Sequence, residues 1–382
     1  MSERKLAHIE RIVDIQPIEG KNNLDATVLG WHVMIRPNEF KVGDLVIYVE
    51  TDSIMPRLPE YEFLAKYDYK VKTQAYFKGT FISQGLILPM PDKWYTHTKA
   101  EEGMDVTEQL GITKYLSKSE QEEITKQVIN QNRLKRFMFR YSWFRRLFLS
   151  RKQKEGFPYW VSKTDEERIQ NIPKVLEQFK DREVYVTEKV DYQSVTFTGK
   201  MIDNTIPIIG RFLPKKFQFV VCSRNMTTND KGSLYWKIAQ KCNIEQILKE
   251  NPTLTIQGEQ GDTKVQGNKY GIKEPTMWVF NIIDYEKNYH YNFKEIQEFC
   301  KKYNLQTVPI LTILNGIVIH TYKIELSKLG STVQELVEFS KGKSVINPNV
   351  EREGVVIRCI ENGKKTLSFK VINPDFLIKH NL

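Results

Sequence analysis

The sequence contains only four cysteines among its 382 residues, and no two of them stand in a CxxC pair. This spacing argues against a zinc site and favours four free thiols in a reducing compartment. No apolar run approaches the ~20 residues that a membrane-spanning helix needs. The opening residues MSERK lack the apolar core of a secretory signal. We therefore expect an intracellular protein that is not secreted, and we do not expect a membrane partner.

Acidic residues are outnumbered, with 47 Asp and Glu against 57 Lys and Arg, which gives a formal net charge of +10. A basic protein attracts polyanions, and nucleic acid is the leading candidate partner. Charge alone does not identify that partner, because many basic proteins bind no nucleic acid. The length is sufficient for two domains, each with a core of its own.

The expected fold class is α+β, with two structural domains joined by a linker. Residues 1–110 contain short β-branched runs separated by turns and no strong helix, which predicts a small barrel or sandwich. An OB-fold is one such barrel and commonly binds oligonucleotides, and we expect an OB-like domain here. After residue 157, apolar strands alternate with amphipathic helices, which predicts a mostly antiparallel sheet. The predicted domains are 1–115 (OB-like), 116–157 (basic aromatic helical linker) and 158–382 (nucleotidyltransferase, on the resemblance given below).

The second domain has a definite predicted element order. Strands are expected at 183–188, 194–198, 217–222, 253–259, 277–283, 354–359 and 366–371, and helices at 233–248, 293–303 and 332–341. A further helix is predicted at 164–180, because Thr164 followed by Glu167 forms a capping-box pattern.

Residues 133–154 combine nine basic residues with six aromatic ones and contain no acid. Three interpretations stay open. The arginines and aromatics contact nucleic acid, the segment forms an amphipathic helix on a membrane surface, or the aromatic stripe packs on the protein itself while the arginines stay solvated.

Charged residues also stand at the ends of predicted strands in the second domain. Lys189 and Asp191 follow one strand, Glu259 closes another, Glu353 precedes a third, and Lys370 lies within the last. Taken singly, each is typical of a solvated strand end. Together, three carboxylates and two lysines suit a site for a triphosphate and Mg²⁺. A nucleophilic lysine must be neutral, so we expect the pKa of Lys189 to be lowered from ~10.4.

The order of these elements resembles that of the covalent nucleotidyltransferases, which include ATP-dependent polynucleotide ligases and mRNA capping enzymes. The matching elements are Lys189-Val190-Asp191-Tyr192, Ser223-Arg224-Asn225, Gly258-Glu259, Trp278-Val279-Phe280-Asn281, Glu353-Gly354 and Phe369-Lys370. The resemblance is closest to the RNA ligase branch in which an OB module precedes the transferase domain. Residues 163–171 and 82–86 are also similar to this branch. DNA ligases and capping enzymes carry their OB module after the transferase domain, so the domain order argues against both.

The resemblance implies a role for each site residue. Lys189 takes AMP from ATP to become lysyl-AMP, and Lys370 contacts the α-phosphate. The implied nucleotide contacts are Glu188 at the adenine edge, Phe280 stacked on adenine, Arg168 and Arg224 on phosphates, and Glu259 on the ribose or a metal-bound water. Asp191, Glu259 and Glu353 are the implied ligands of hydrated Mg²⁺ (or Mn²⁺). The implied partner is RNA, as a nicked duplex or as strand ends, bound by a monomer.

One departure from the family pattern is Tyr192, which stands where the motif has glycine. Glycine permits backbone conformations that tyrosine resists. The expected function is an ATP-dependent RNA ligase that seals 3′-hydroxyl and 5′-phosphate ends through lysyl-AMP and AMP-capped RNA. A catalytically inactive OB-type RNA-binding homologue and a ligase for DNA-containing nicks remain the alternatives.

Overall fold

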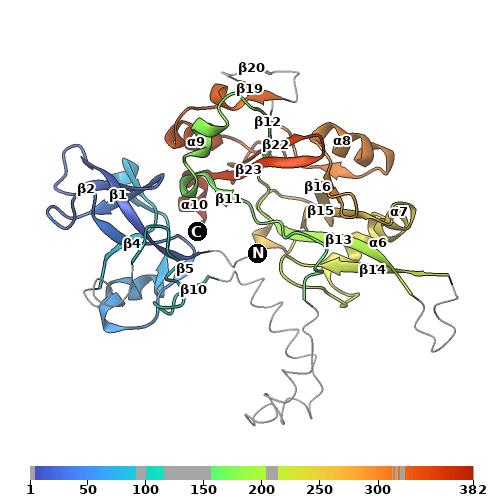
Figure 1. Ribbon diagram of the computed structural model, residues 1–382, viewed down its shortest axis with the longest axis horizontal. Coiled ribbons are helices and arrows are strands. Elements are labelled where there is room, and N and C mark those ends of the chain that lie inside the picture. Colours follow the sequence, from blue (N-terminus) through green and yellow to red (C-terminus); the bar gives the residue numbers. More distant parts are fainter. Residues whose placement is uncertain are drawn as a thin grey trace, which may run out of the picture.

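The computed structural model describes residues 5–91, 100–115, 156–203, 214–311 and 323–381, with the backbone of 313–314 and 317–318. It is α+β, with an N-terminal group of small sheets beside a larger two-sheet unit (Figure 1). The predicted linker lies almost wholly outside the described residues, as does the basic aromatic segment 133–154. The domain boundaries at 115 and 157 therefore stay predictions. Within the described residues, no helix is long and apolar enough to cross a membrane.

The N-terminal unit is an OB-like half-barrel built around one long strand. Strand β1 pairs antiparallel with β2 along its second half and with β4 along its first half. A register shift between Ile12 and Asp14 allows β1 to bend between its pairing with β4 and its pairing with β2. The strands of the main sheet, in spatial order, are β3 (Trp31–Ile35), β2 (Leu24–Val28), β1 (Ala7–Pro17), β4 (Leu45–Val49) and β9 (Leu86–Pro89). Smaller sheets contain β10 (Thr113–Lys114), β5 (Ser53–Ile54) and β6 (Lys70–Val71), and β7 (Gln74–Tyr76) with β8 (Phe81–Ser83).

The second unit contains two sheets whose long strand pairs are all antiparallel. One sheet is ordered β11 (Glu167–Arg168), β23 (Lys364–Ile372), β22 (Gly354–Glu361), β12 (Glu183–Glu188), β21 (Ile324–Glu325). The other is ordered β14 (Lys216–Cys222), β13 (Gln193–Ile202), β15 (Leu254–Gly261), β16 (Thr276–Asp284), β17 (Tyr289–His290). Two short pairs are parallel, β11 with β23 and β18 (Gln306–Thr307) with β16. A small hairpin pairs β19 (Ile313–Leu314) with β20 (Ile317–Val318).

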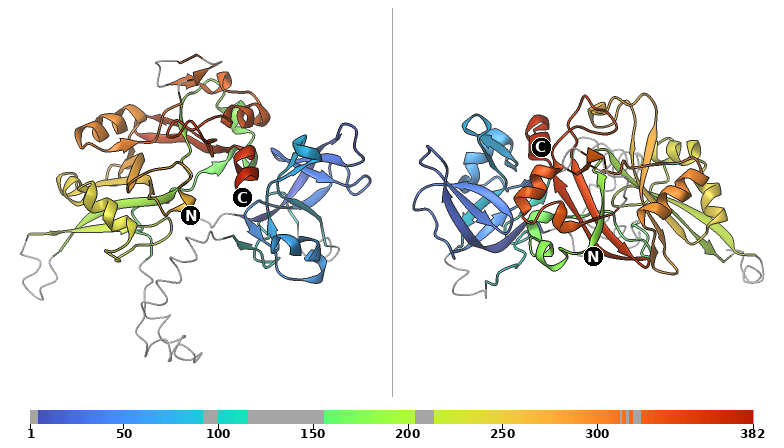
Figure 2. Two further views of the ribbon diagram at one scale, coloured as in Figure 1. Left: turned by 180° about the vertical axis from the view of Figure 1, so that it is seen from behind. Right: turned by 90° about the horizontal axis from the view of Figure 1, so that it is seen from above.

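Helices cover the outer faces of these sheets (Figures 1 and 2). Helices α6 (Leu234–Lys241), α7 (Ile244–Glu250) and α8 (Phe293–Lys302) pack their buried residues on β13, β15 and β16. Helices α5 (Val175–Gln178) and α9 (Val333–Ser340) cover β12, β22 and β23. Helix α10 (Pro374–His380) follows β23 near the N-terminal unit. Helix 233–248 of the sequence prediction is divided in two at Asn243, which has the positive φ of 52°.

The helix predicted at 164–180 is wrong over most of its length. Residues 167–168 form strand β11, and only Val175–Gln178 is α-helical. The side chains of this segment bond to other parts of the chain: Thr164 contacts Ser194, and Glu166 forms a buried ion pair with Arg358. These long-range contacts outweigh the local capping pattern, whose contribution is typically ~1 kcal/mol.

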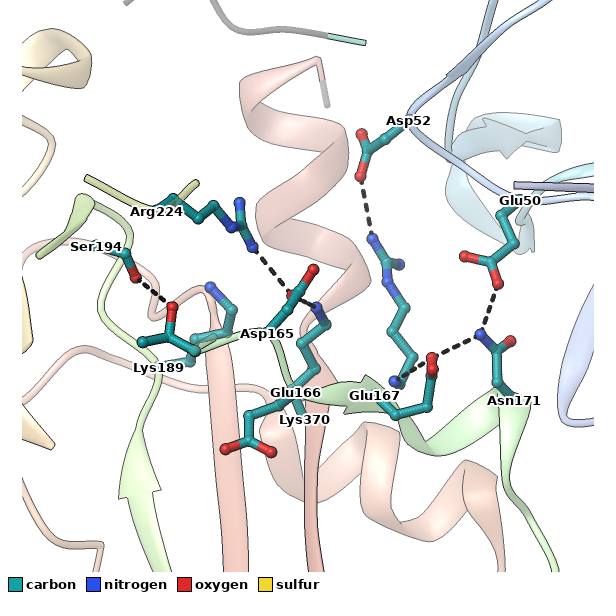
Figure 3. Close-up of polar contacts among 12 residues, drawn as sticks. Glu50, Asp52, Asp165, Glu166, Glu167, Asn171, Lys189, Ser194, Arg224 and Lys370 are labelled. Carbon is teal, nitrogen blue, oxygen red and sulfur yellow. Dashed lines mark hydrogen bonds and ion pairs between the residues drawn. The ribbon is translucent and has the colours of Figure 1, made fainter. Parts of the chain in front are cut away.

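Asn171 is the centre of the contact between the two units (Figure 3). Its amide nitrogen donates to Glu50 at 2.6 Å and to Glu167 at 2.8 Å, and its oxygen accepts from the Trp31 indole at 2.6 Å. Glu50 is almost fully buried. Its charge is offset by His8, 3.6 Å away. Burial would lower the pKa of His8, but its carboxylate neighbours raise the pKa to about 9.

We expect Asn171→Ala to loosen this contact, because the buried Glu50 carboxylate and the Trp31 indole each lose a hydrogen-bond partner. Leaving such groups unsatisfied costs about 1–3 kcal/mol. Faster hydrogen exchange at the Gly30 amide would show this loosening, because that amide donates across the contact to the Gln170 carbonyl at 2.8 Å. Asn251→Ala is the matched control, since the Asn251 side chain bonds only within the second unit. Unchanged exchange at Gly30 in Asn171→Ala would contradict this role.

Candidate active site

A pocket lies where the two sheets of the second unit meet. The described residues that line it are Thr164, Asp165, Glu166, Thr187, Glu188, Lys189, Val190, Ser194, Arg224, Glu259, Phe280, Val308, Val356, Arg358 and Lys370. Strand β12 brings Glu188 and Lys189 to the pocket, while β15 brings Glu259 and β23 brings Lys370. Of the residues predicted from the sequence, the pocket therefore gathers Lys189, Glu188, Glu259, Phe280, Arg224 and Lys370.

Lys189 follows the end of β12 and forms an ion pair with Glu353. Its amine nitrogen Nζ is 2.6 Å from Glu353 Oε2, and its backbone N–H donates to the Gly354 carbonyl at 2.9 Å. Glycine is required at 354 because φ is +154° and a Cβ there would lie 2.2 Å from the Val371 carbonyl oxygen. The backbone of β22 and β23 thus fixes both partners of the ion pair.

The charge around Lys189 favours its protonated form. Burial alone would lower its pKa, but the carboxylates of Glu353, Glu259 and Asp191 raise the pKa above its ordinary value. This is the reverse of the lowered pKa that the sequence analysis expected. With these carboxylates around it Lys189 is an ammonium ion, and it must lose a proton before it can act as a nucleophile.

Glu259 carries a buried carboxylate that is only half satisfied. Its Oε1 accepts from the Ser194 hydroxyl at 2.9 Å, while its Oε2 is buried and has no hydrogen-bond partner among the described residues. Burial raises the pKa of Glu259 to about 8, although Lys189 acts in the opposite direction. A buried oxygen without a partner suits a ligand such as a hydrated cation.

The three predicted metal ligands do not converge on one point. Among the described residues, no group of three or more His, Cys, Asp or Glu side chains forms a ready-made metal cluster. Asp191 forms an ion pair with Lys269, and it is not among the lining residues of the pocket. Glu259 and Glu353 both act on the pKa of Lys189 and lie nearer to it. This arrangement fits Mg²⁺, which uses one or two carboxylates and keeps several waters, better than a fully protein-coordinated ion.

Asp165 joins the two cations that were predicted to contact phosphate (Figure 3). Its Oδ1 is 3.0 Å from Lys370 Nζ and 3.0 Å from Arg224 Nη2. A carboxylate therefore sits between a lysine and an arginine, where a phosphate oxygen would find the same two donors. Sequence reasoning assigned no role to Asp165, although its segment was part of the family resemblance.

Arg168 does not line the pocket but points towards the N-terminal unit. Its Nη2 is 3.3 Å from Asp52 Oδ2, and its guanidinium lies 5.5 Å from the centroid of the Trp31 ring. Its remaining nitrogens, Nε and Nη1, are buried without hydrogen-bond partners among the described residues. The strand register pairs Arg168 with Lys370, which does line the pocket.

Phe280 and Glu188 line one side of the pocket, to which Phe280 contributes an apolar ring and Glu188 a carboxylate. The Arg358 guanidinium lies 5.3 Å from the centroid of the Phe280 ring and is held there by Glu166 at 3.1 Å. Glu188 accepts from the Val345 amide at 2.8 Å through Oε2, and its Oε1 is buried without a partner in the described part of the chain. The Glu166–Arg358 pair was missed in the sequence, although an arginine in the apolar strand 354–361 requires a buried acid.

Tyr192 fits its position without backbone strain. Its φ is not in the left-handed region. Its ring stacks on Trp278 with centroids 5.7 Å apart, and its hydroxyl donates to Asn268 at 3.0 Å. The ring occupies space left by Gly261, where an added Cβ would come within 2.9 Å of it. The loop after Lys189 therefore keeps its shape with tyrosine at this position.

Comparisons with known proteins agree with this arrangement. Residues 182–372 match the RNA ligase family model, and residues 6–90 match an OB-fold domain model. Among curated proteins, none matches the sequence. Among solved structures, the chain is similar to Naegleria gruberi RNA ligase with pyrophosphate, with 30% identity over 99% of both chains and a TM-score of 0.75. The chain is also similar to two mutants of the same enzyme. The mutant with ATP and manganese is 28% identical over 99% of this chain and 100% of that chain, with a TM-score of 0.75. The mutant with AMP and manganese is 28% identical over 99% of both chains, with a TM-score of 0.74.

We expect Asp165→Asn to bind pyrophosphate more tightly, because an incoming anion no longer displaces a carboxylate from Lys370 and Arg224. The gain should be up to about fivefold, since a partly exposed ion pair contributes up to ~1 kcal/mol. Calorimetric titration would measure it. Asp181→Asn, which removes the same charge at an exposed site, is the control. Weaker binding by Asp165→Asn would instead mean that Asp165 orients the two cations for the ligand.

Proposed function

This chain belongs to the RNA ligase family, and on that premise we propose that it is an ATP-dependent RNA ligase. It would join a 3′-hydroxyl to a 5′-phosphate through lysyl-AMP at Lys189 and an AMP-capped RNA strand. ATP and a divalent cation, Mg²⁺ or Mn²⁺, are the proposed cofactors, since structures of the similar Naegleria enzyme contain ATP, AMP and manganese. The observation that carries the proposal is the Lys189 amine, paired with Glu353 inside a pocket that also holds Lys370 and Arg224.

The proposed reaction has three transfers at phosphorus. First, Lys189 Nζ attacks the α-phosphorus of ATP, so that a P–N bond forms and the P–O bond to pyrophosphate breaks. Second, an oxygen of the RNA 5′-phosphate attacks the same phosphorus, which breaks the P–N bond and caps the RNA with AMP. Third, the 3′-hydroxyl attacks the RNA 5′-phosphorus, the phosphodiester forms and AMP leaves.

Lys189 must lose a proton before the first step. Glu353 Oε2, 2.6 Å from the amine, is the nearest group able to receive it. A divalent cation bound through Glu259 and Glu353, with Asp191 close by, would compensate the negative charge that raises the pKa of Lys189. The same carboxylates thus hold Lys189 in place at rest and define where the compensating charge binds.

The other pocket residues have distinct proposed tasks. Lys370 and Arg224 stabilise charge on the transferring phosphate once that phosphate has displaced the Asp165 carboxylate from them. Phe280, held by Arg358, offers a ring for adenine to stack on, and Glu188 presents a buried carboxylate at the same side. Arg168 has two unsatisfied nitrogens with which to reach the outer phosphates. The strain-free fit of Tyr192 supports the active ligase over the inactive homologue.

We expect the protein to retain ³²P when it is incubated with Mg²⁺ and ATP labelled on the α-phosphate and then denatured. Lys189→Ala should retain none, because it lacks the nucleophile, and labelled GTP should give none. Sealing of nicked duplexes with RNA or DNA at either side of the break would then show which strands are accepted. Absence of label in the wild type, even with pyrophosphatase present, would contradict the proposal and favour an RNA-binding role.

We also expect Mg²⁺ binding near pH 7 to release up to about one proton per ion, because a carboxylate must be ionised to bind a cation. Glu259, whose pKa is about 8, holds its proton below that pH, so the release should vanish as the pH rises above 8. Calorimetry in buffers of different ionisation enthalpy measures the released protons. Glu259→Gln has no such proton and should release fewer. Equal release by wild type and Glu259→Gln would contradict the assignment.

A further inference from the structure

Tyr159 is an exposed aromatic residue that its neighbours hold in place. Its side chain is 83% exposed, the largest value among the exposed large hydrophobic residues of the described chain. The Trp160 ring lies edge-on to it, with centroids 5.0 Å apart and an interplanar angle of 88°. The Lys200 ammonium donates to the Tyr159 hydroxyl at 2.8 Å and lies 5.1 Å from the centroids of both rings. An exposed ring fixed in this way loses little conformational entropy when a flat ligand stacks on it.

The ring is connected to the pocket along one face of β13. Trp160 donates to Thr198, the Ser162 carbonyl accepts from Gln257, and Thr164 bonds to Ser194. Residues 159–164 therefore lie along the face that carries the even-numbered side chains of β13. Ser194 is at the pocket end of this face and bonds to Glu259. The opposite face of β13 packs on the helical core.

The outer end of this face carries positive charge. Register pairs Ile202 with Lys216 and Lys200 with Gln218, so Lys200 and Lys216 project from the same face and are diagonal neighbours. Lys215 is also exposed, with Asp203 as its acidic neighbour at 3.9 Å. Figures 1 and 2 show that the β13–β14 hairpin extends away from the N-terminal unit. This end is therefore a separate surface from the OB-like half-barrel.

We propose that Tyr159, Lys200 and Lys216 form a docking surface for single-stranded RNA that flanks the break. Tyr159 stacks on one unpaired base, and the two lysines contact the adjoining phosphates. The inference rests on the proposed RNA ligase function and adds a substrate feature, a single-stranded extension. Six residues separate Ser194 from Lys200, which spans about 20 Å of strand. For a strand with stacked bases, at about 3.4 Å per nucleotide, this distance from the pocket end at Ser194 corresponds to roughly six nucleotides.

The test uses RNA duplexes with a break and a single-stranded extension of three or ten nucleotides on either strand. Anisotropy should show that Tyr159→Ala binds the ten-nucleotide extension about tenfold more weakly, the loss typical of one stacked base. The three-nucleotide extension, which with stacked bases covers only about half of that distance, should be bound by Tyr159→Ala about as tightly as by the wild type. Tyr159→Phe keeps the ring and should retain most of the affinity. Abasic substitutions along the extension should reveal one sensitive position, roughly six nucleotides from the break.

Salt dependence tests the lysines separately. Lys216→Ala should reduce the slope of log affinity against log salt by about 0.7, the value for one phosphate contact on a single strand. Lys237→Ala is the charge-matched control, because Lys237 is exposed on α6, which covers the opposite face. Its slope should equal that of the wild type. An equal effect of both variants would overturn the assignment of Lys216.

Two further readouts separate this inference from the proposed function. Tyr159→Ala should form lysyl-AMP at the wild-type rate and unfold at the wild-type temperature, because the ring is exposed and remote from Lys189. Loss of either would mean that the ring stabilises the fold, and the docking role would be overturned. Normal RNA binding by Tyr159→Ala on all extensions would also overturn it. Failure of the wild type itself to bind RNA or form lysyl-AMP would instead count against the ligase function.

Discussion

The extended backbone of residues 164–168 is the constraint on which the site depends. Its last two residues pair in parallel with β23, which sets Arg168 beside Lys370. In an extended chain successive side chains point to opposite sides, so neighbouring residues reach different structures. Asp165 pairs with Lys370 and Arg224, Glu166 holds Arg358 beside Phe280, and Arg168 contacts the N-terminal unit. A helix here would have pointed these side chains in other directions and disconnected the pocket from the domain contact.

A second feature is that the reactive amine is stored in its charged form. An isolated ammonium in this partly buried setting would be costly, and the Glu353 carboxylate, 2.6 Å away, is the nearest group that offsets that cost. Burial also acts on the neighbouring acids, and it raises the pKa of Glu259 to about 8. The resting site is therefore a balance of opposed charges, and any ligand that changes this balance also changes the reactivity of Lys189. Binding and activation are coupled by electrostatics without a need for large movement.

Most strands of the second unit could be predicted from the sequence, because each contains a short apolar or β-branched run. The identities of Lys189, Glu259 and Lys370 as pocket residues followed from their order along the chain. The helix at 164–180 could not be rejected from local signals, since its capping pattern is real but its partners are distant. The pairing of Asp191 with Lys269 and of Asp165 with Lys370 likewise depends on three-dimensional neighbours that no sequence spacing encodes.

The fit between Tyr192 and Gly261 has a consequence for how sequences of this kind should vary. The two positions share one volume: the ring that is added at the first is accommodated by the side chain that is missing at the second. A homologue with glycine at the first position therefore has room for a larger residue at the second. We expect the side-chain volumes at the two positions to vary in opposite directions. Consensus design that restored the motif glycine alone would leave an unfilled space beside Trp278. The mismatch with the motif is therefore matched by a change in packing, with the Tyr192 ring lying against Gly261 and Trp278.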